Sequence, residues 1–359
     1  MAAGEGTRMR SERPKPLHVL CGRPMLLHVI DTLAGLPVER VVVVVGHGAE
    51  RVTKTLQEQA PPEFVMEFVE QHVQRGTGDA ASVALTVFPD DDFDDGDILV
   101  LPGDAPLLQP ATLAALLREH RLSDAAATLL TARLDDPSGY GRILREKDGR
   151  VSRIVEEPDA TEEERAVDEV GTSIYCFRRS LMAPALRRLN PENTQGEYYL
   201  TDIVGVLHDT GHKVVSVVAP DPRETVGVND RVQLADAERE LRRRINDHWM
   251  REGVTMLDPR STCIDVDVEL AAEVTLYPET MLQGRTVVGA GAHLGPNVRL
   301  VDCVVGPRAW VEQAVGHDAE VGAGAVVGPF AVLSPGSHVP EGAHTGPFYT
   351  ATIGDDEGV

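Results

Sequence analysis

Apolar residues recur along this chain with two different periods, and the change falls near residue 262. Before it, short aliphatic runs typical of buried strands alternate with stretches at the three-to-four spacing of amphipathic helices. The pattern predicts helices at 24–36, 50–59, 80–87 and 112–120, and strands at 40–45, 64–69, 98–101 and 125–132. Strands separated by helices in this way predict an α/β domain, with a mostly parallel sheet and helices on both faces.

After residue 262 an aliphatic residue returns every six positions, often followed by glycine. These positions are Ile264, Leu270, Leu276, Leu282, Val288, Leu294 and Leu300, and, after a slip in phase, Val315, Val321, Val327, Leu333 and Val339. A six-residue period predicts a parallel β-helix, in which each repeat forms one flat side and its aliphatic side chain points into the prism. The repeats are enough for roughly four to five three-sided coils with a continuous core.

Residues 230–251, between the two patterns, predict one long helix. Asn229 or Asp230 could cap its start, and Gly253 lies just past its end. The expected organisation is a first domain at 1–228, a linker helix at 229–253, a β-helix at 254–346 and an acidic tail at 347–359.

The glycine-rich stretch at 2–16 carries the strongest chemical signal. Its small residues let backbone N–H groups close around phosphate oxygens. Arg8 and Lys15 follow within reach of the same oxygens. The stretch lacks the Gly-Lys-Ser/Thr ending of a P-loop and the third glycine of a dinucleotide fingerprint. It resembles the phosphate loop of sugar-phosphate nucleotidyltransferases. In this loop, Ala2, Ala3 and Gly4 are expected to bind substrate.

A strand is expected before this loop, in the centre of the sheet, yet the loop follows Met1 directly. We therefore expect an apolar strand upstream of Met1 in the native protein, which N-terminal sequencing or the upstream reading frame would reveal. Without that strand the sheet is incomplete, and we expect poor stability.

Composition narrows the function classes. The chain has 359 residues, 42% of them apolar, and a net charge of −23, which argues against non-specific nucleic-acid binding. We find no signal-peptide pattern and no membrane span. The four widely spaced cysteines fit reduced, buried side chains in a cytoplasmic protein. The acidic run at 90–95 predicts a solvated turn rather than a metal site.

Nine short runs occur in the order and spacing of a known family, and they lie at 2–9, 13–24, 26–30, 76–78, 103–107, 136–143, 154–156, 195–202 and 227–229. The most specific are Gln-Gly-Glu-Tyr-Tyr at 195–199 and Ser-Gly-Tyr-Gly-Arg-Ile at 138–143. With them the chain resembles the bacterial bifunctional N-acetylglucosamine-1-phosphate uridylyltransferase/glucosamine-1-phosphate acetyltransferase family. The resemblance covers the uridylyltransferase domain and the start of a left-handed β-helix.

The resemblance implies transfer of a uridylyl group from UTP to N-acetylglucosamine 1-phosphate, a step of cell-wall biosynthesis. Asp104 and Asn229 would bind Mg²⁺, while Arg8 and Lys15 would neutralise the phosphates and the leaving pyrophosphate. Positions that resemble the uracil-reading residues are Gln71, Gly76 and Thr77. The other substrate-binding positions are Gly103, Gly141, Glu156, Gly171, Tyr199 and Thr201. The resemblance also implies a homotrimer formed side by side through the β-helix.

Two positions on the sugar side depart from the family. Gly171 replaces an asparagine, and Pro102 stands where an aromatic residue can occur. A missing side-chain amide removes hydrogen bonds worth about 1 kcal/mol each. Another sugar 1-phosphate, such as glucose 1-phosphate with UTP or dTTP, therefore stays open. So does a non-catalytic nucleotide-sugar sensor, although a sensor would be expected to lose part of the metal and phosphate set.

The second activity of the family is expected to be absent. The family's acetyl-transferring histidine falls beyond residue 359, and Ser334 replaces a basic residue. Thr352 and Ile353 stand at the positions of a lysine pair. We therefore predict no acetyl transfer, and transfer from acetyl-CoA to glucosamine 1-phosphate by the pure protein would contradict this.

Overall fold

The computed structural model describes residues 1–88 and 96–351. The chain forms two compact units, Met1–His18 with Pro24–Leu234, and Val19–Arg23 with Ala235–Val359. The acidic run at 90–95 and positions 352 and 353 lie outside the described residues. Among the described helices, none combines the length and the apolar composition needed to cross a membrane.

The first unit contains the predicted alternation of helices and strands. Its α-helices are α1 (Met25–Asp31), α2 (Ala49–Gln59), α3 (Thr77–Leu85), α4 (Pro110–Leu122), α5 (Glu162–Arg165), α6 (Arg179–Leu186) and α7 (Asp202–Asp209). Its strands are β3 (Val41–Val45), β4 (Met66–Glu70), β5 (Asp97–Val100), β6 (Ala127–Arg133), β7 (Arg142–Arg145), β8 (Val151–Val155), β9 (Glu169–Arg178) and β10 (Val214–Val218). Short 3-10 turns are η1 (Thr7–Met9), η2 (Lys15–Leu17), η3 (Glu157–Asp159) and η4 (Pro222–Thr225).

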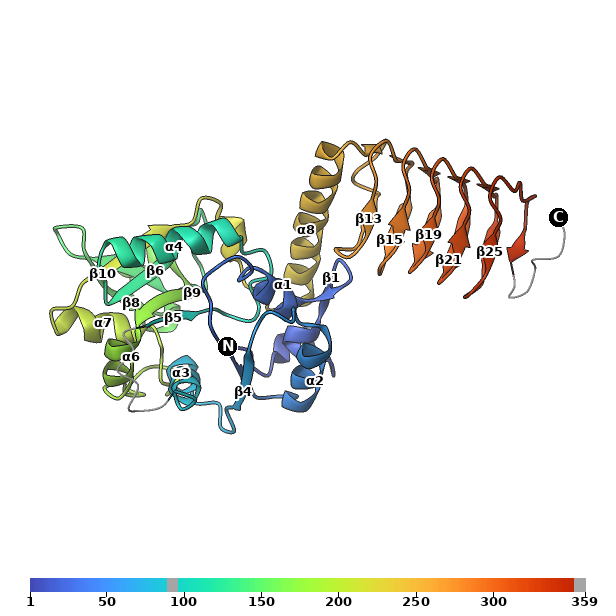
Figure 1. Cartoon of the computed structure of the whole chain (residues 1–359). Coiled ribbons are helices and arrows are strands. Elements are labelled where there is room, and N and C mark those ends of the chain that lie inside the picture. Colours follow the sequence, from blue (N-terminus) through green and yellow to red (C-terminus); the bar gives the residue numbers. More distant parts are fainter. Residues whose placement is uncertain (89–95, 352–359) are drawn as a thin grey trace. The chain divides into compact units, whose positions relative to one another are not determined.

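Strand β9 pairs with three other strands of the main sheet and so holds that sheet together. It was not among the predicted strands. It runs antiparallel to β5, β6 and β7, whereas β6 and β10 are parallel. Its apolar side chains are buried on both faces, with Ile174 packed beside Leu130 and Tyr175 beside Leu129. Helix α4 covers the first of these faces, and α6 and α7 cover the second, as predicted for the domain (Figure 1).

Strands β3 and β4 form a separate parallel pair. All five residues of β3 are valine, which suits a strand covered on both faces. Val43 and Val45 pack with residues of α1 and α2, and Val44 packs with Ala80 of α3. Ala2 forms a parallel bridge to Val45, so the chain's first residues lie beside the carboxyl end of β3.

Helix α8 (Arg231–Arg251) leads from the first unit into the second. Its amide side chain Asn246 is 1% exposed and donates to the carbonyl oxygens of Pro259 and Thr262 at 2.8 and 3.0 Å. These bonds fix the helix against the start of the first coil. Near the other end of the chain, β1 (Val19–Leu20) pairs with β2 (Arg23–Pro24).

The second unit contains the predicted β-helix (Figure 1). Its described residues form three parallel sheets of five, six and five strands. The strands are β11 (Thr255–Met256), β12 (Cys263–Ile264), β13 (Glu269–Leu270), β14 (Thr275–Leu276), β15 (Thr280–Gln283), β16 (Val287–Val288), β17 (His293–Leu294), β18 (Val298–Val301), β19 (Val304–Val305), β20 (Trp310–Val311), β21 (Ala314–His317), β22 (Glu320–Val321), β23 (Val326–Val327), β24 (Ala331–Leu333), β25 (His338–Val339) and β26 (Thr350–Ala351). Because β26 pairs with β24, the β-helix continues past residue 346.

One inward position of the repeat was predicted wrongly. Val315 is 52% exposed, and its neighbours Ala314 and Gly316 face the core instead. Gly316 pairs with Leu300 of the previous coil, and a Cβ added to it would lie 2.9 Å from Leu300 Cδ2. The inward residue at this level therefore has no side chain, which hides it from a search for aliphatic residues. All the other predicted aliphatic positions are buried.

All four cysteines are free, as predicted. Cys21, Cys176 and Cys303 are buried, and Cys263 is half-buried. Burial raises the pKa of the Cys21 thiol, and the nearby carboxylate of Glu238 raises it further.

Candidate active site

Four predicted residues from distant segments meet around one point in the first unit. Lys15 Nζ forms an ion pair with Asp104 Oδ2 and donates to Asn229 Oδ1 at 2.8 Å. Arg8 Nη2 donates to the same amide oxygen at 3.0 Å. The carboxylate of Asp104 and the amide oxygen of Asn229 are therefore both within bonding distance of one nitrogen, which brings the two predicted metal ligands together.

The backbone around Asn229 explains how its side chain reaches this point. Asp230 caps α8, because its Oδ1 accepts from the N–H groups of Val232 and Gln233 at 2.9 Å each. The Asn229 amide is therefore not needed as a helix cap. Gln233 Oε1 accepts from the Asn229 N–H at 2.7 Å, and Val228 N–H donates to the Asp104 carbonyl at 2.8 Å.

The phosphate loop closes directly over Lys15. Gly6 has a φ of 67°, and a Cβ added to it would lie 2.7 Å from Lys15 Cβ, so a side chain at residue 6 would push the lysine away. Ala3 is buried and its carbonyl oxygen accepts from Gln74 Nε2 at 2.7 Å. At the other end of the loop, Arg231 Nε donates to the Met9 carbonyl at 3.0 Å. Gly4 is exposed between these two anchors.

The predicted uracil-side residues form a second group. Gln71 is 5% exposed, and its Nε2 donates to Asp79 Oδ2 at 2.8 Å and to the Gly76 carbonyl at 3.1 Å. Since a carboxylate only accepts, Asp79 fixes which end of the Gln71 amide faces it. Thr77 Oγ1 accepts from the Leu200 N–H at 3.0 Å.

The predicted sugar-side residues form a third group. Thr201 Oγ1 donates to Glu156 Oε1 at 2.9 Å, and Gly171 N–H donates to the Gly141 carbonyl at 2.8 Å. Burial raises the pKa of Glu156, and the hydrogen bond from Thr201 opposes this rise. Burial also raises the pKa of the neighbouring Tyr199 to about 12.

Hydrogen bonds between segments connect the three groups. Gly103 N–H donates to the Met1 carbonyl at 2.8 Å, which ties the segment of Asp104 to the phosphate loop. Gln74 ties the loop to the segment of Gln71, as described above. The segment at 198–201 touches both Thr77 and Glu156. The structure thus places every predicted site residue in one connected region.

Sequence reasoning missed several residues that position this region. They are Gln74, Asp79, Arg231 and Gln233, and none belongs to a spacing pattern that would have marked it. Arg142 was also missed, although it lies in the motif at 138–143. It is 2% exposed, and its Nη2 lies 2.6 Å from Glu157 Oε2. This buried ion pair braces the start of β7 beside Gly141.

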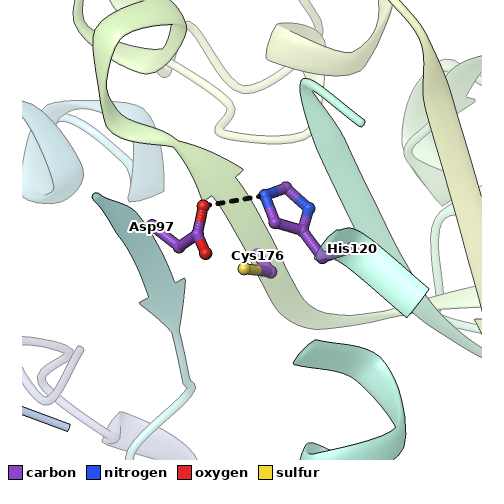
Figure 2. A group of neighbouring side chains, drawn as sticks. All are labelled: Asp97, His120 and Cys176. Carbon is purple, nitrogen blue, oxygen red and sulfur yellow. Dashed lines mark ion pairs between the residues drawn. The ribbon is translucent and has the colours of Figure 1, made fainter. Parts of the chain in front are cut away.

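A separate group of metal-ligating side chains lies on β5, α4 and β9. Figure 2 shows the carboxylate of Asp97 facing the ring of His120, with the sulfur of Cys176 beside them. His120 Nε2 is 3.2 Å from Asp97 Oδ1, and Nδ1 is 2.8 Å from Thr128 Oγ1. Burial raises the pKa of the Cys176 thiol and lowers that of His120. With both ring nitrogens engaged and the thiol held protonated, we read this group as a packing contact.

Comparisons with known proteins show which family the chain belongs to. Residues 1–249 match the family model described as Nucleotidyl transferase. "Bifunctional protein GlmU" of Thermobifida fusca (strain YX) is 46% identical over 323 residues, which are 90% of this chain and 66% of that protein. The protein of the same name from Brevibacillus brevis is 45% identical over 358 residues, 99% of this chain and 76% of the relative. The protein of the same name from Desulfitobacterium hafniense (strain Y51) is 46% identical over 322 residues, which are 90% of this chain and 69% of that relative.

The chain spans about two thirds to three quarters of the length of these relatives. Proteins of this family generally use a divalent metal ion, together with a nucleoside triphosphate and a sugar phosphate. The predicted resemblance and the predicted class of enzyme are both confirmed. The chain belongs to the nucleotidyl transferase family, and it is a sugar-1-phosphate nucleotidyltransferase related to the GlmU proteins.

Proposed function

We propose that this chain transfers the uridylyl group of UTP to N-acetylglucosamine 1-phosphate and releases pyrophosphate, with Mg²⁺ held by Asp104 and Asn229. The observation that carries the proposal is the meeting of these two side chains with Lys15 Nζ. This arrangement places two oxygen ligands, from Asp104 and Asn229, at the end of the phosphate loop. The cationic side chains of Lys15 and Arg8 lie beside them, where two anionic substrates have to be brought together.

The residues present fit a magnesium ion. A hard cation prefers oxygen ligands, and Mg²⁺ usually takes one or two from protein and the rest from phosphates and water. The Lys15 ammonium already lies between the two oxygens, which supports a cation at this point. Pairing one carboxylate with a neutral amide also limits negative charge beside the substrates. Bound there, Mg²⁺ would offset the charge of the triphosphate and orient the α-phosphate.

The reaction needs no protein nucleophile, because the sugar phosphate is already nucleophilic. One of its oxygens forms a bond to the α-phosphorus of UTP. The bond from that phosphorus to the bridging oxygen breaks, and pyrophosphate leaves with the electron pair. Lys15 and Arg8 would turn from Asn229 to the β- and γ-phosphates and stabilise the charge that builds up there.

The other two groups would position the substrates. Gln71 and Thr77, whose orientations are fixed by Asp79 and Leu200, would bind the edge of the uracil base. Glu156 would accept hydrogen bonds from the N-acetyl or hydroxyl groups of the sugar, with Thr201 holding the carboxylate in place. Holding both substrates in line supplies much of the rate enhancement of a transfer reaction.

Pyrophosphate release over a panel of nucleotides and sugar 1-phosphates tests the proposal. We expect the fastest release with UTP and N-acetylglucosamine 1-phosphate, and loss of release when EDTA removes the metal. Release that is independent of divalent metal would contradict the proposed metal site. Nucleotide binding without release from any pair would favour the sensor.

Gly171 keeps a second candidate open, namely transfer to another sugar 1-phosphate such as glucose 1-phosphate with UTP or dTTP. A Cβ added there would find its nearest neighbour at 3.6 Å, so the position has room for a side chain that this protein lacks. A higher kcat/KM with glucose 1-phosphate than with the N-acetylated sugar would establish this alternative.

Three further expectations stay predictions. The relatives are named bifunctional, whereas we predict that this chain does not transfer acetyl groups. The side-by-side homotrimer and the cytoplasmic location also remain to be tested, the first by light scattering of the purified chain.

A further inference from the structure

Strand β9 is irregular where it passes the sugar-side group. Tyr175 of β9 pairs with Leu129 of β6, and Gly171 of β9 pairs with Thr131. Four steps along β9 therefore lie opposite two steps along β6, so the residues between Gly171 and Tyr175 form a bulge. Bulges are common beside active sites, where they re-aim a side chain.

The middle residue of this bulge is Ser173, and its backbone is strained. Its φ is 61°, in the left-handed region that residues other than glycine seldom adopt. Among residues 1–88 and 96–351, Ser173 is the one residue other than glycine with a positive φ inside a strand. Its neighbours Thr172 and Ile174 are buried, whereas Ser173 is exposed. Strain kept at an exposed position is often part of a functional site.

Two observations connect Ser173 with the sugar-side group. Burial raises the pKa of the Tyr175 phenol, the charge of Glu156 raises it further, and a side-chain hydrogen bond with Ser173 opposes both effects. These three side chains are therefore neighbours. Gly171, two residues before Ser173, donates its N–H to the Gly141 carbonyl at 2.8 Å. A Cβ added to Gly141 would lie 3.3 Å from Glu156 Oε2, so the carboxylate faces the same corner of the site.

An N-acetylated sugar needs a hydrogen-bond donor that the sugar-side residues described above do not offer. Its N-acetyl group carries an N–H, which donates, and a carbonyl oxygen, which accepts. A carboxylate only accepts, so Glu156 can bind the N–H but not the carbonyl oxygen. The Thr201 hydroxyl donates to Glu156, and the Gly171 N–H donates to Gly141, so both protons are in use. Gly171 has no side chain, and the Tyr199 hydroxyl oxygen is buried.

The Ser173 hydroxyl can supply this donor and keep its contact with Tyr175. A serine hydroxyl donates one hydrogen bond and has two lone pairs that accept, while a tyrosine hydroxyl also donates one. The Tyr175 O–H can donate to Ser173 Oγ, which leaves the Ser173 proton for a ligand. Because Ser173 is exposed, a ligand can reach that proton.

We propose that Ser173 is a specificity-determining residue of the sugar site, and that its hydroxyl donates a hydrogen bond to the N-acetyl carbonyl oxygen of the sugar 1-phosphate. The inference rests on the proposed uridylyl transfer and names the residue that recognises the N-acetyl group. It also accounts for Gly171, because the polar side chain of β9 stands two residues further along, on the bulge. Glucose 1-phosphate carries a hydroxyl in place of the N-acetyl group and gains less from Ser173.

Isothermal titration of the full chain with UDP-N-acetylglucosamine and with UDP-glucose tests the proposal. Titration needs no turnover, so its result is independent of the pyrophosphate assay. Ser173→Ala should raise the Kd for UDP-N-acetylglucosamine about five- to tenfold through the loss of one hydrogen bond, and that for UDP-glucose less than about twofold. The Kd for UTP should stay unchanged. Ser216→Ala is the matched control, because it removes a hydroxyl of the same sheet that bonds to Arg145, and it should leave all three Kd values unchanged.

Two further variants separate direct binding from a structural role. Ser173→Gly removes the strain together with the hydroxyl. It should bind UDP-N-acetylglucosamine as weakly as Ser173→Ala, while its thermal midpoint lies about 2–4 °C higher than that of Ser173→Ala. Tyr175→Phe removes the partner of Ser173 but leaves the serine hydroxyl free to donate. It should change the Kd for UDP-N-acetylglucosamine less than about twofold.

An unchanged Kd for UDP-N-acetylglucosamine in Ser173→Ala would overturn the proposal. Equal losses for both nucleotide sugars would do the same, as would an equal loss in Tyr175→Phe, because Ser173 would then act only by holding Tyr175. Failure of the unmodified chain to bind either nucleotide sugar would overturn both this proposal and the proposed function. Binding by the unmodified chain without pyrophosphate release would reject the proposed function alone and leave the result for Ser173 standing.

Discussion

Replacing Lys15 by methionine is the sharpest test of the proposed site. The change keeps most of the apolar stem and removes the ammonium that bonds to both Asp104 and Asn229. If Lys15 stabilises the leaving pyrophosphate, kcat/KM should fall by about 10²–10³-fold, the usual effect of losing one charge-stabilising group, or roughly 3–4 kcal/mol.

The same substitution should affect the resting enzyme in the opposite direction. In the structure the ammonium lies at the point where we place the metal, so it competes with a cation for the oxygens of Asp104 and Asn229. Without it, Mg²⁺ should bind more tightly in the absence of nucleotide, by about tenfold or more. Arg8 still donates to Asn229 at 3.0 Å and would keep that side chain in place.

Pyrophosphate release measures the first effect, and isothermal titration with Mg²⁺ measures the second. Lys54→Met is the matched control, because Lys54 is 74% exposed and forms an ion pair with Glu58 of its own helix. A rate for Lys15→Met within threefold of the unmodified chain would refute the catalytic role. Weaker metal binding in that variant would refute the shared position of ammonium and metal.

Four further predictions follow from individual residues. Burial lowers the pKa of the Met1 ammonium from 8.0 to about 6, so folding opposes its protonation. Stability should therefore rise by about 2 kcal/mol from pH 6 to pH 8 in denaturant unfolding, and a flat profile would contradict the buried charge. Glu156→Gln should raise the thermal midpoint at pH 7, since folding raises the pKa of this carboxyl and so penalises its charged form, while KM for the sugar phosphate increases about tenfold and KM for UTP stays unchanged. Gly171→Asn should be tolerated and should lower KM for N-acetylglucosamine 1-phosphate, and an unchanged KM would remove this position from the sugar site. In the β-helix, Gly316→Ala should destabilise the chain by about 1–3 kcal/mol through overpacking, whereas Val315→Ala should change stability by less than about 0.5 kcal/mol.

Periodic features of the sequence predicted the fold well. The valine run of β3 and the six-residue repeat both depend on side chains that must be buried, and burial leaves a regular trace along the chain. The prediction failed at Gly316, where the inward side chain is absent, and it omitted four strands of the first unit, namely β7, β8, β9 and β10. Of these, β9 is set by pairing with segments far away in the sequence, on which a local pattern carries no information.

The candidate site was predicted from motifs, and the structure adds what holds them in place. Lys15, Asp104 and Asn229 could be named from the sequence, but their meeting at one point depends on Gly6, Gln233 and the cap at Asp230. Each of these residues acts through a contact between two segments of the chain. Their positions follow no period and lie in no stretch of distinctive composition, so the sequence does not mark them. Such contacts appear only when the chain is folded.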